Sequence, residues 1–195
     1  YLSMKKNIFV FGFFLLLTLI FFAPFLSGEQ ILGFKDLSRY FYPLRHLMVE
    51  QVRAGLWPLW NPYIFCGFPL LATLQIGFFY PLTWIFYLLP FNLAFNYFTI
   101  AHYFLAPCFM YLLLKHYKFH TPSAIFGGIL FGFSGYLLSV SNMNTSLEAA
   151  IWLPLVILFF DRWIKEKSFF NLIGVALTLA LEFLGGEPTI IYVTS

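Results

Sequence analysis

Long apolar runs separated by short polar segments make up most of the chain. The first run, residues 7–26, is long enough to cross the hydrocarbon core of a bilayer. Four later runs predict further spans, at residues 91–114, 123–140, 147–164 and 169–184. We therefore expect residues 1–195 to form a single transmembrane domain. Its fold class is an all-α integral membrane protein, a polytopic helical bundle with about five or six spans.

The apolar run at residues 70–90 leaves the topology open, because it is long enough to cross but contains Gln75 and Pro81. Five basic residues flank the later spans: Lys115, Lys118, Arg162, Lys165 and Lys167. If the run crosses, all five lie outside. If it is re-entrant or lies on the surface, all five lie inside, which the positive-inside tendency prefers.

The start of the chain resembles both a signal peptide and a first span. Lys5 and Lys6 precede the apolar run, which predicts a cytoplasmic N-terminus. Because the run is too long for a signal peptide and no small-residue cleavage site follows it, we expect an uncleaved span. Residues 27–69 then form an extracytoplasmic loop.

The extracytoplasmic loop is predicted to contain one short helix, residues 43–54. Pro43 suits its first turn, Gly55 its end, and Leu44, Leu47, Met48 and Val52 share one face. Arg45, His46, Glu50 and Arg53 fall on the other side. We expect an interfacial amphipathic helix that lies apolar side down, with its basic groups at headgroup level.

Proline and aromatic residues dominate the rest of the loop, LWPLWNPYIFCGFP at residues 56–69. Pro58, Pro62 and Pro69 forbid a regular helix there. Trp57, Trp60 and Tyr63 supply the amphipathic rings that anchor proteins at membrane interfaces. We expect an ordered, aromatic-walled loop in which these three side chains serve as anchors or offer flat faces to a sugar ring.

Composition supports a membrane protein and excludes several other classes. Hydrophobic residues make up 61% of the chain and charged residues 10%, and the mean hydropathy is +0.83. A net charge of +3 is too small and dispersed to predict nucleic-acid binding. The two cysteines, Cys66 and Cys108, indicate neither a disulfide framework nor a thiolate metal site.

Three acids are candidate site residues if the loop and two later polar segments face the same side. Asp36 lies in the loop, Glu148 in SNMNTSLEA and Glu187 in GGEP, and we expect them to converge. An acid near a bilayer is costly unless it is paired or faces a wet cavity. Simpler roles stay open: Asp36 can cap a helix or pair with Arg39, Glu148 can cap its span, and Glu187 can be solvated.

Three other patterns have structural explanations. His116 and His120 stand four apart, but no acid accompanies them, so we interpret them as interfacial histidines rather than a metal pair. Gly128 and Gly132 form a GxxxG pattern that predicts close helix packing. His102 is interpreted as an interhelical hydrogen bonder, with Glu182 as a candidate partner.

A series of motifs resembles the bacterial YfhO family of membrane proteins over nearly the whole chain. The motifs are Asp36, Tyr42-Pro43, GLWPLWNPY at 55–63, GFPL at 67–70, Gln75, Tyr80-Pro81, His102, FSGY at 133–136, WLPL at 152–155 and GGEP at 185–188. PLWNPY followed by GFPL and a later FSGY is specific to the resemblance. The apolar residues between these motifs carry no such information.

The resemblance implies a function. That family is similar to the GT-C glycosyltransferases, which take a sugar from a polyprenyl-phosphate carrier and bear an acid in the first extracytoplasmic loop. Asp36 matches that acid and would be the catalytic base. The resemblance also implies a cell-envelope polymer as acceptor, membrane lipids as surroundings, and the bacterial cytoplasmic membrane as the multi-pass location. Family members are much longer than this chain, with many more spans and an extracytoplasmic part near the end.

Substrate-binding roles follow from this chemistry. Arg39, Arg45 and Arg53 could neutralise the phosphate of the carrier, with Arg39 preferred because it is closest to Asp36 in sequence. The remaining candidates for substrate binding are Trp57, Trp60, Asn61, Tyr63, Glu148 and Glu187. No cofactor or metal site is expected, although a divalent cation stays possible.

Two alternative functions stay open. A lipid-carrier flippase or transporter would need charged residues buried in mid-span, where the sequence offers only Glu182 and His102. A non-catalytic assembly subunit would not depend on Asp36. We also expect a longer protein, because Met4 is a candidate native start and an apolar run begins at residue 190.

Overall fold

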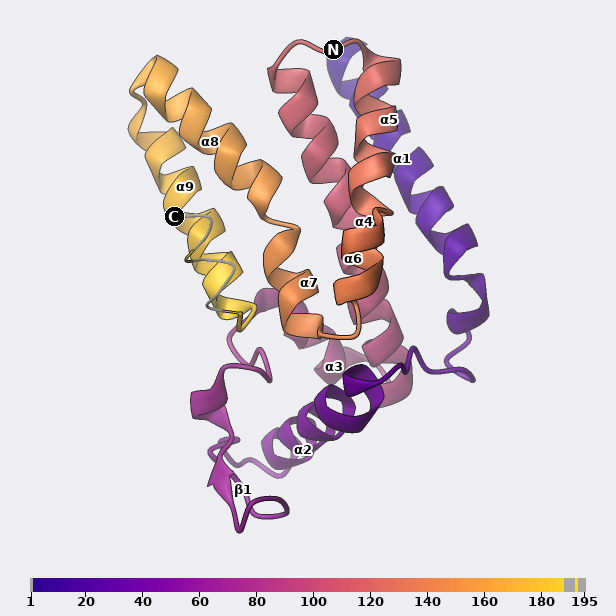
Figure 1. The fold of residues 1–195 in the computed structure, drawn as a ribbon, viewed down its shortest axis with the longest axis vertical. Coiled ribbons are helices and arrows are strands. Elements are labelled where there is room, and N and C mark those ends of the chain that lie inside the picture. The colour runs from indigo at the N-terminus through magenta and orange to yellow at the C-terminus, as the bar shows by residue number, and fades with distance from the viewer. Residues whose placement is uncertain (1, 188–191, 193–195) are drawn as a thin grey trace.

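A computed structural model describes residues 2–187 and Tyr192 (Figure 1). The helices are α1 (Leu2–Phe21), α2 (Tyr42–Arg53), α3 (Ile85–Leu88), α4 (Phe91–His116), α5 (Thr121–Gly132), α6 (Gly135–Val140), α7 (Asn144–Ala150), α8 (Leu153–Glu166) and α9 (Phe169–Leu184). Short helical turns are η1 (Ala23–Phe25), η2 (Leu37–Phe41), η3 (Leu71–Thr73) and η4 (Pro81–Trp84). Strands β1 (Trp60–Asn61) and β2 (Phe68–Pro69) form an antiparallel hairpin. The apolar run expected from residue 190 lies outside the described residues, Tyr192 excepted.

The long helices run roughly alongside one another and leave the polar segments at two ends (Figure 1). One end holds the start of α1, the α4–α5 turn and the α8–α9 turn, and we name it the turn end. The opposite end holds α2, α3 and the β1–β2 hairpin, and we name it the loop end. All five basic residues that flank the later spans belong to the turn end.

Two stretches of the described chain are long and apolar enough to cross a membrane: α4, and Thr121–Val140, which covers α5 and α6. Asn7–Phe21 and α9 are shorter apolar helices. Two predicted spans are each interrupted by a short break. The span at 123–140 is divided between α5 and α6, and the span at 147–164 is divided between α7 and α8. Ser134 starts α6 afresh by accepting a hydrogen bond from the Leu137 N–H at 3.2 Å. The second break falls between α7 and α8, just before Pro154 in the first turn of α8, where proline disfavours a continuing helix.

Residues 70–90 form turns and the short helix α3 rather than one long helix. Figure 1 shows this segment remaining at the loop end, so α4 starts from the end at which α1 finishes. The described residues 70–90 therefore contain no helix long enough to cross a bilayer, and the topology of the chain stays a prediction.

Helices α4 and α5 pack closely because glycines face a proline. A Cβ on Gly132 would lie 2.6 Å from Pro107 Cδ, and a Cβ on Gly128 would lie 2.9 Å from the Pro107 carbonyl oxygen. Only glycine allows the backbones to approach this far. The predicted packing role of the GxxxG pattern is confirmed.

Helix α2 begins and ends close to where the sequence predicts, but its surroundings differ from the prediction. Leu44, Met48 and Val49 are buried in a core at the loop end that also contains Phe86 and Phe95. The apolar face thus packs on α3 and the start of α4 instead of on lipid. The prediction failed because an apolar face reads the same in sequence whether lipid or protein covers it.

Candidate functional site at the loop end

Two adjoining hollows lie where η2 and α2 meet the β1–β2 hairpin. The smaller, about 140 Å³, is lined by Arg39, Tyr40, Pro43, Leu44, Leu47, Asn61, Tyr63 and Ile64. The larger, about 310 Å³, is lined by Tyr42, Pro43, His46, Leu47, Glu50 and Tyr63. Pro43, Leu47 and Tyr63 belong to both. We name this shared depression the loop groove; it brings together three predicted substrate-binding residues, Arg39, Asn61 and Tyr63.

Arg39 is the cation of the smaller hollow. Its side chain is exposed and forms no ion pair with any residue that the structure describes. Tyr40, next to it, is partly buried, and this burial raises the pKa of its phenol. The hollow therefore offers a free guanidinium beside a neutral hydroxyl donor, a combination suited to a phosphate oxygen.

Asp36 directly precedes η2, three residues before Arg39. The carboxylate is exposed, does not cap the turn through its side chain, and makes no hydrogen bond or ion pair with the described residues. The capping role and the Arg39 pair considered for Asp36 are therefore not seen. Its carboxylate can accept a proton from an incoming hydroxyl.

The β1–β2 hairpin is ordered by side chains that the sequence assigned to substrate. Asn61 is buried, and its Oδ1 accepts the Tyr63 N–H at 2.9 Å. Gln51 of α2 donates from Nε2 to the Trp60 carbonyl at 2.9 Å. Asn61 thus shapes the wall of the loop groove, and its Oδ1 is already used by the backbone.

The three aromatic side chains assigned to anchoring or sugar binding, Trp57, Trp60 and Tyr63, are 63%, 51% and 79% exposed. Trp60 lies against Gly67, where an added Cβ would stand 2.6 Å from its Cζ2. Trp57 contacts Phe78, with ring centroids 5.7 Å apart. All three rings face out of the protein core, as either of their predicted roles requires.

Arg45 corrects the sequence interpretation most strongly. It was expected at headgroup level, but its side chain is fully buried and pairs with Glu148 of α7, which is equally buried. The guanidinium also lies over the Phe98 ring, 4.4 Å from its centroid. Neither side chain is accessible to a lipid headgroup, so both serve the fold at this position.

Arg53 is exposed and donates from Nη2 to the Phe86 carbonyl at 3.3 Å.

The three acids expected to converge are only partly brought together. Glu187 reaches α7, where the hydroxyls of Thr145 and Ser146 donate to its Oε2 at 3.5 and 3.4 Å. Glu148 lies on the same short helix. Among the described residues, Asp36 shares no side-chain partner with either of these acids. Glu148 and Glu187 therefore meet at α7, the first as a residue of the helix and the second through its hydrogen bonds. Asp36 belongs to the loop.

A buried hydrogen-bonded chain beneath the site was not found from the sequence. Trp152 Nε1 donates to the Tyr80 hydroxyl at 3.1 Å, and that hydroxyl donates to His102 Nε2 at 2.9 Å. The other ring nitrogen, Nδ1, lies 2.6 Å from the Phe98 carbonyl and donates to it. His102 is a satisfied buried hydrogen bonder, but its contacts are not interhelical: Tyr80 comes from the turn before η4, and Phe98 belongs to α4 itself. This network gives three motif residues a structural role.

Asn96 of α4 fixes the start of the loop, a role that no sequence pattern predicted. Its Oδ1 accepts the Leu32 N–H at 2.9 Å, and its Nδ2 donates to the carbonyls of Phe25 and Gln30 at 2.8 and 2.7 Å. A lone asparagine in an apolar helix gives the same sequence pattern whether its side chain faces a loop or another helix.

Among the described residues, no group of three His, Cys, Asp or Glu side chains lies close enough to share a metal ion.

Comparison with known proteins adds one match. The model of a family described as bacterial membrane protein YfhO matches residues 9–183. No curated protein matches the chain, and neither does any solved structure.

Proposed function

Because the chain belongs to the YfhO family of bacterial membrane proteins, we propose that it transfers a sugar from a polyprenyl-phosphate carrier to a cell-envelope polymer. One observation carries the proposal. A free carboxylate, Asp36, stands three residues from Arg39, a free guanidinium that lines an open groove. An acid that accepts a proton and a cation that neutralises a phosphate are the two groups that such a transfer needs.

Each group has a separate role in the proposed reaction. Asp36 takes the proton of the acceptor hydroxyl as its oxygen attacks the anomeric carbon of the sugar. The bond between that carbon and the carrier phosphate breaks, and the phosphate leaves with its negative charge, which Arg39 stabilises. Tyr63 offers a ring face to the sugar, and Trp57 and Trp60 hold the loop at the membrane surface.

The proposed location is the bacterial cytoplasmic membrane, crossed several times, with the loop end facing outward. The distribution of basic residues supports this orientation. Lys115, Lys118, Arg162, Lys165 and Lys167 gather at the turn end, and basic loops favour the cytoplasmic side. A lipid carrier in the outer leaflet would then present its sugar at the loop groove.

Sugar transfer by the full-length protein tests the proposal. We expect Asp36→Asn to lower transfer from a radiolabelled polyprenyl-phosphate sugar at least 100-fold, the low end of general-base effects. Glu29→Gln is the matched control, since it removes another exposed acid from the same loop. Neither acid lines the loop groove itself, but Asp36 stands three residues from Arg39, which does. Absence of transfer by the wild-type protein would sink the proposal and favour the assembly-subunit alternative. Wild-type transfer by Asp36→Asn would show that Asp36 is not the base.

A further inference from the structure

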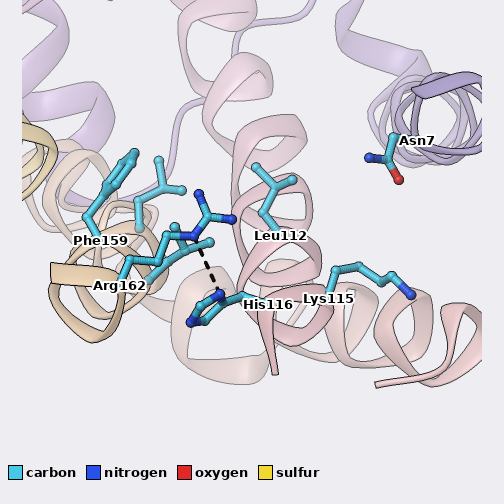
Figure 2. A pocket seen from close by; sticks show the side chains of 8 residues that line it. Asn7, Leu112, Lys115, His116, Phe159 and Arg162 are labelled. Atoms are coloured by element: carbon cyan, nitrogen blue, oxygen red, sulfur yellow. Dashed lines mark hydrogen bonds between the residues drawn. The ribbon is translucent and has the colours of Figure 1, made fainter. Parts of the chain in front are cut away.

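A second hollow, of about 270 Å³, lies at the turn end between α1, α4 and α8 (Figure 2). It is lined by Asn7, Leu112, Lys115, His116, Leu155, Leu158, Phe159 and Arg162. Half of these residues are polar or basic and half are apolar. The function proposed above uses none of them, and this end of the bundle lies opposite the loop groove.

The charge of Arg162 is not neutralised within the hollow. Its Nε donates to His116 Nδ1 at 3.4 Å, shown in Figure 2, so the His116 proton is on Nε2 and is donated to Asp161 Oδ2 at 2.6 Å. Asp161 is also paired with Lys165, again at 2.6 Å. The Nη groups of Arg162 have no partner in the described part of the chain and stay available as donors.

Lys115 adds a second cation. Its ammonium donates to the Phe119 carbonyl at 3.0 Å and to the Thr121 hydroxyl at 3.3 Å. Both acceptors are neutral, and no described carboxylate pairs with Lys115. Two hydrogen bonds hold the ammonium in place while its charge remains unpaired. These two acceptors lie at the α4–α5 turn and do not line the hollow, and Figure 2 shows Lys115 extending away from Arg162.

The Oδ1 atom of Asn7 accepts the Tyr111 hydroxyl at 3.0 Å. The hollow therefore holds the guanidinium of Arg162 and the Nδ2 group of Asn7, with the charge of Lys115 at its edge.

We propose that this hollow binds the headgroup of an anionic phospholipid from the leaflet that the turn end faces. The phosphate would accept hydrogen bonds from the Nη groups of Arg162, and the Lys115 ammonium would attract it by charge from the edge of the hollow, as basic pockets between membrane helices do for lipid phosphates. The apolar half, with Leu112, Leu155 and Phe159, would contact the first carbons of the acyl chains. Inorganic phosphate could accept the same hydrogen bonds, but it has no acyl chain to contact these apolar side chains.

Native mass spectrometry of the full-length protein, released from nanodiscs of phosphatidylcholine with a minor fraction of phosphatidylglycerol, tests the proposal. We expect wild type to retain phosphatidylglycerol in preference to phosphatidylcholine. Arg162→Gln and Lys115→Gln should each lower that retention about fivefold, and the double variant about 30-fold, as expected for the loss of one positive charge each near the lipid surface. Lys118→Gln is the matched control, because it removes a charge from the same end outside the hollow and should retain the lipid normally.

Three outcomes would overturn the inference. Unchanged retention by the double variant would show that the hollow is not the site. Equal loss in Lys118→Gln would show attraction by the whole end rather than a site. Displacement of the lipid by millimolar inorganic phosphate would assign the hollow to a free anion instead. Circular dichroism of each variant checks that the helices are kept, so a loss of lipid is not a loss of fold.

Discussion

Arg45 of α2 and Glu148 of α7 form a fully buried ion pair between residues 103 positions apart in the chain. The pair ties the loop at residues 27–69 to the helix that also receives Glu187. Gly77 packs beside it, where an added Cβ would lie 3.3 Å from Glu148 Oε2 and 3.6 Å from Arg45 Nη2. The loop is thus held on the bundle by charge as well as by apolar contacts.

Removing one partner of this pair should destabilise the protein strongly. Glu148→Gln leaves the Arg45 charge buried and uncompensated, which costs about 3–5 kcal/mol. The double variant Arg45→Met with Glu148→Met should be more stable than Glu148→Gln, because it buries no charge. Thermal unfolding of the full-length protein in detergent measures the free energies. Arg45→Met and Glu148→Met, made singly, complete the cycle. If their losses add up to the loss in the double variant, the two side chains are not directly coupled.

Asn96→Ala should free the chain between α1 and η2. The substitution removes three hydrogen bonds to loop backbone, at about 1 kcal/mol each. Limited proteolysis should then cut within residues 25–32 much faster than in wild type. Asn92→Ala is the control, since Asn92 makes one exposed hydrogen bond, accepting from the Tyr42 hydroxyl at 2.6 Å. Equal cleavage in both variants would show that Asn96 does not fix this segment.

The elements could be read from the sequence, but the partners of buried polar residues could not. The helix at 43–54, the glycine packing and the apolar runs follow from local spacing and appear in the structure with shifted ends or breaks. The surroundings of Arg45 were predicted wrongly, because helical periodicity shows which face of a helix a residue lies on but not which part of the protein covers that face. His116 seemed to have no acid, since Asp161 comes from a helix 45 residues later. Such pairings depend on tertiary arrangement, which local patterns do not contain.

Gly67→Ala should disrupt the hairpin that forms one wall of the loop groove. Gly67 has φ +98°, and its Cβ would stand 2.6 Å from Trp60 Cζ2. We expect a lower midpoint of unfolding and a red-shifted tryptophan emission. Gly55→Ala is a matched control, because Gly55 also has a positive φ of +76° but has no atom within 4 Å of an added Cβ. The control should lose only the stability that backbone strain removes, about 1 kcal/mol of the free energy of unfolding. If both variants behave alike, the Trp60 contact adds nothing to the hairpin.

Gly132→Leu should separate α4 from α5. Its Cβ would lie 2.6 Å from Pro107 Cδ, and a proline ring in the middle of α4 cannot move aside without moving the helix backbone. Overpacking of this kind typically costs 1–3 kcal/mol. Unfolding of the full-length protein in detergent should show that loss. Gly12→Leu is the control, because a Cβ at Gly12 of α1 meets no atom within 4 Å and leucine is a better helix former than glycine. We expect Gly12→Leu to be neutral or slightly stabilising. A comparable loss in both variants would mean that leucine is harmful for a reason other than the contact with Pro107.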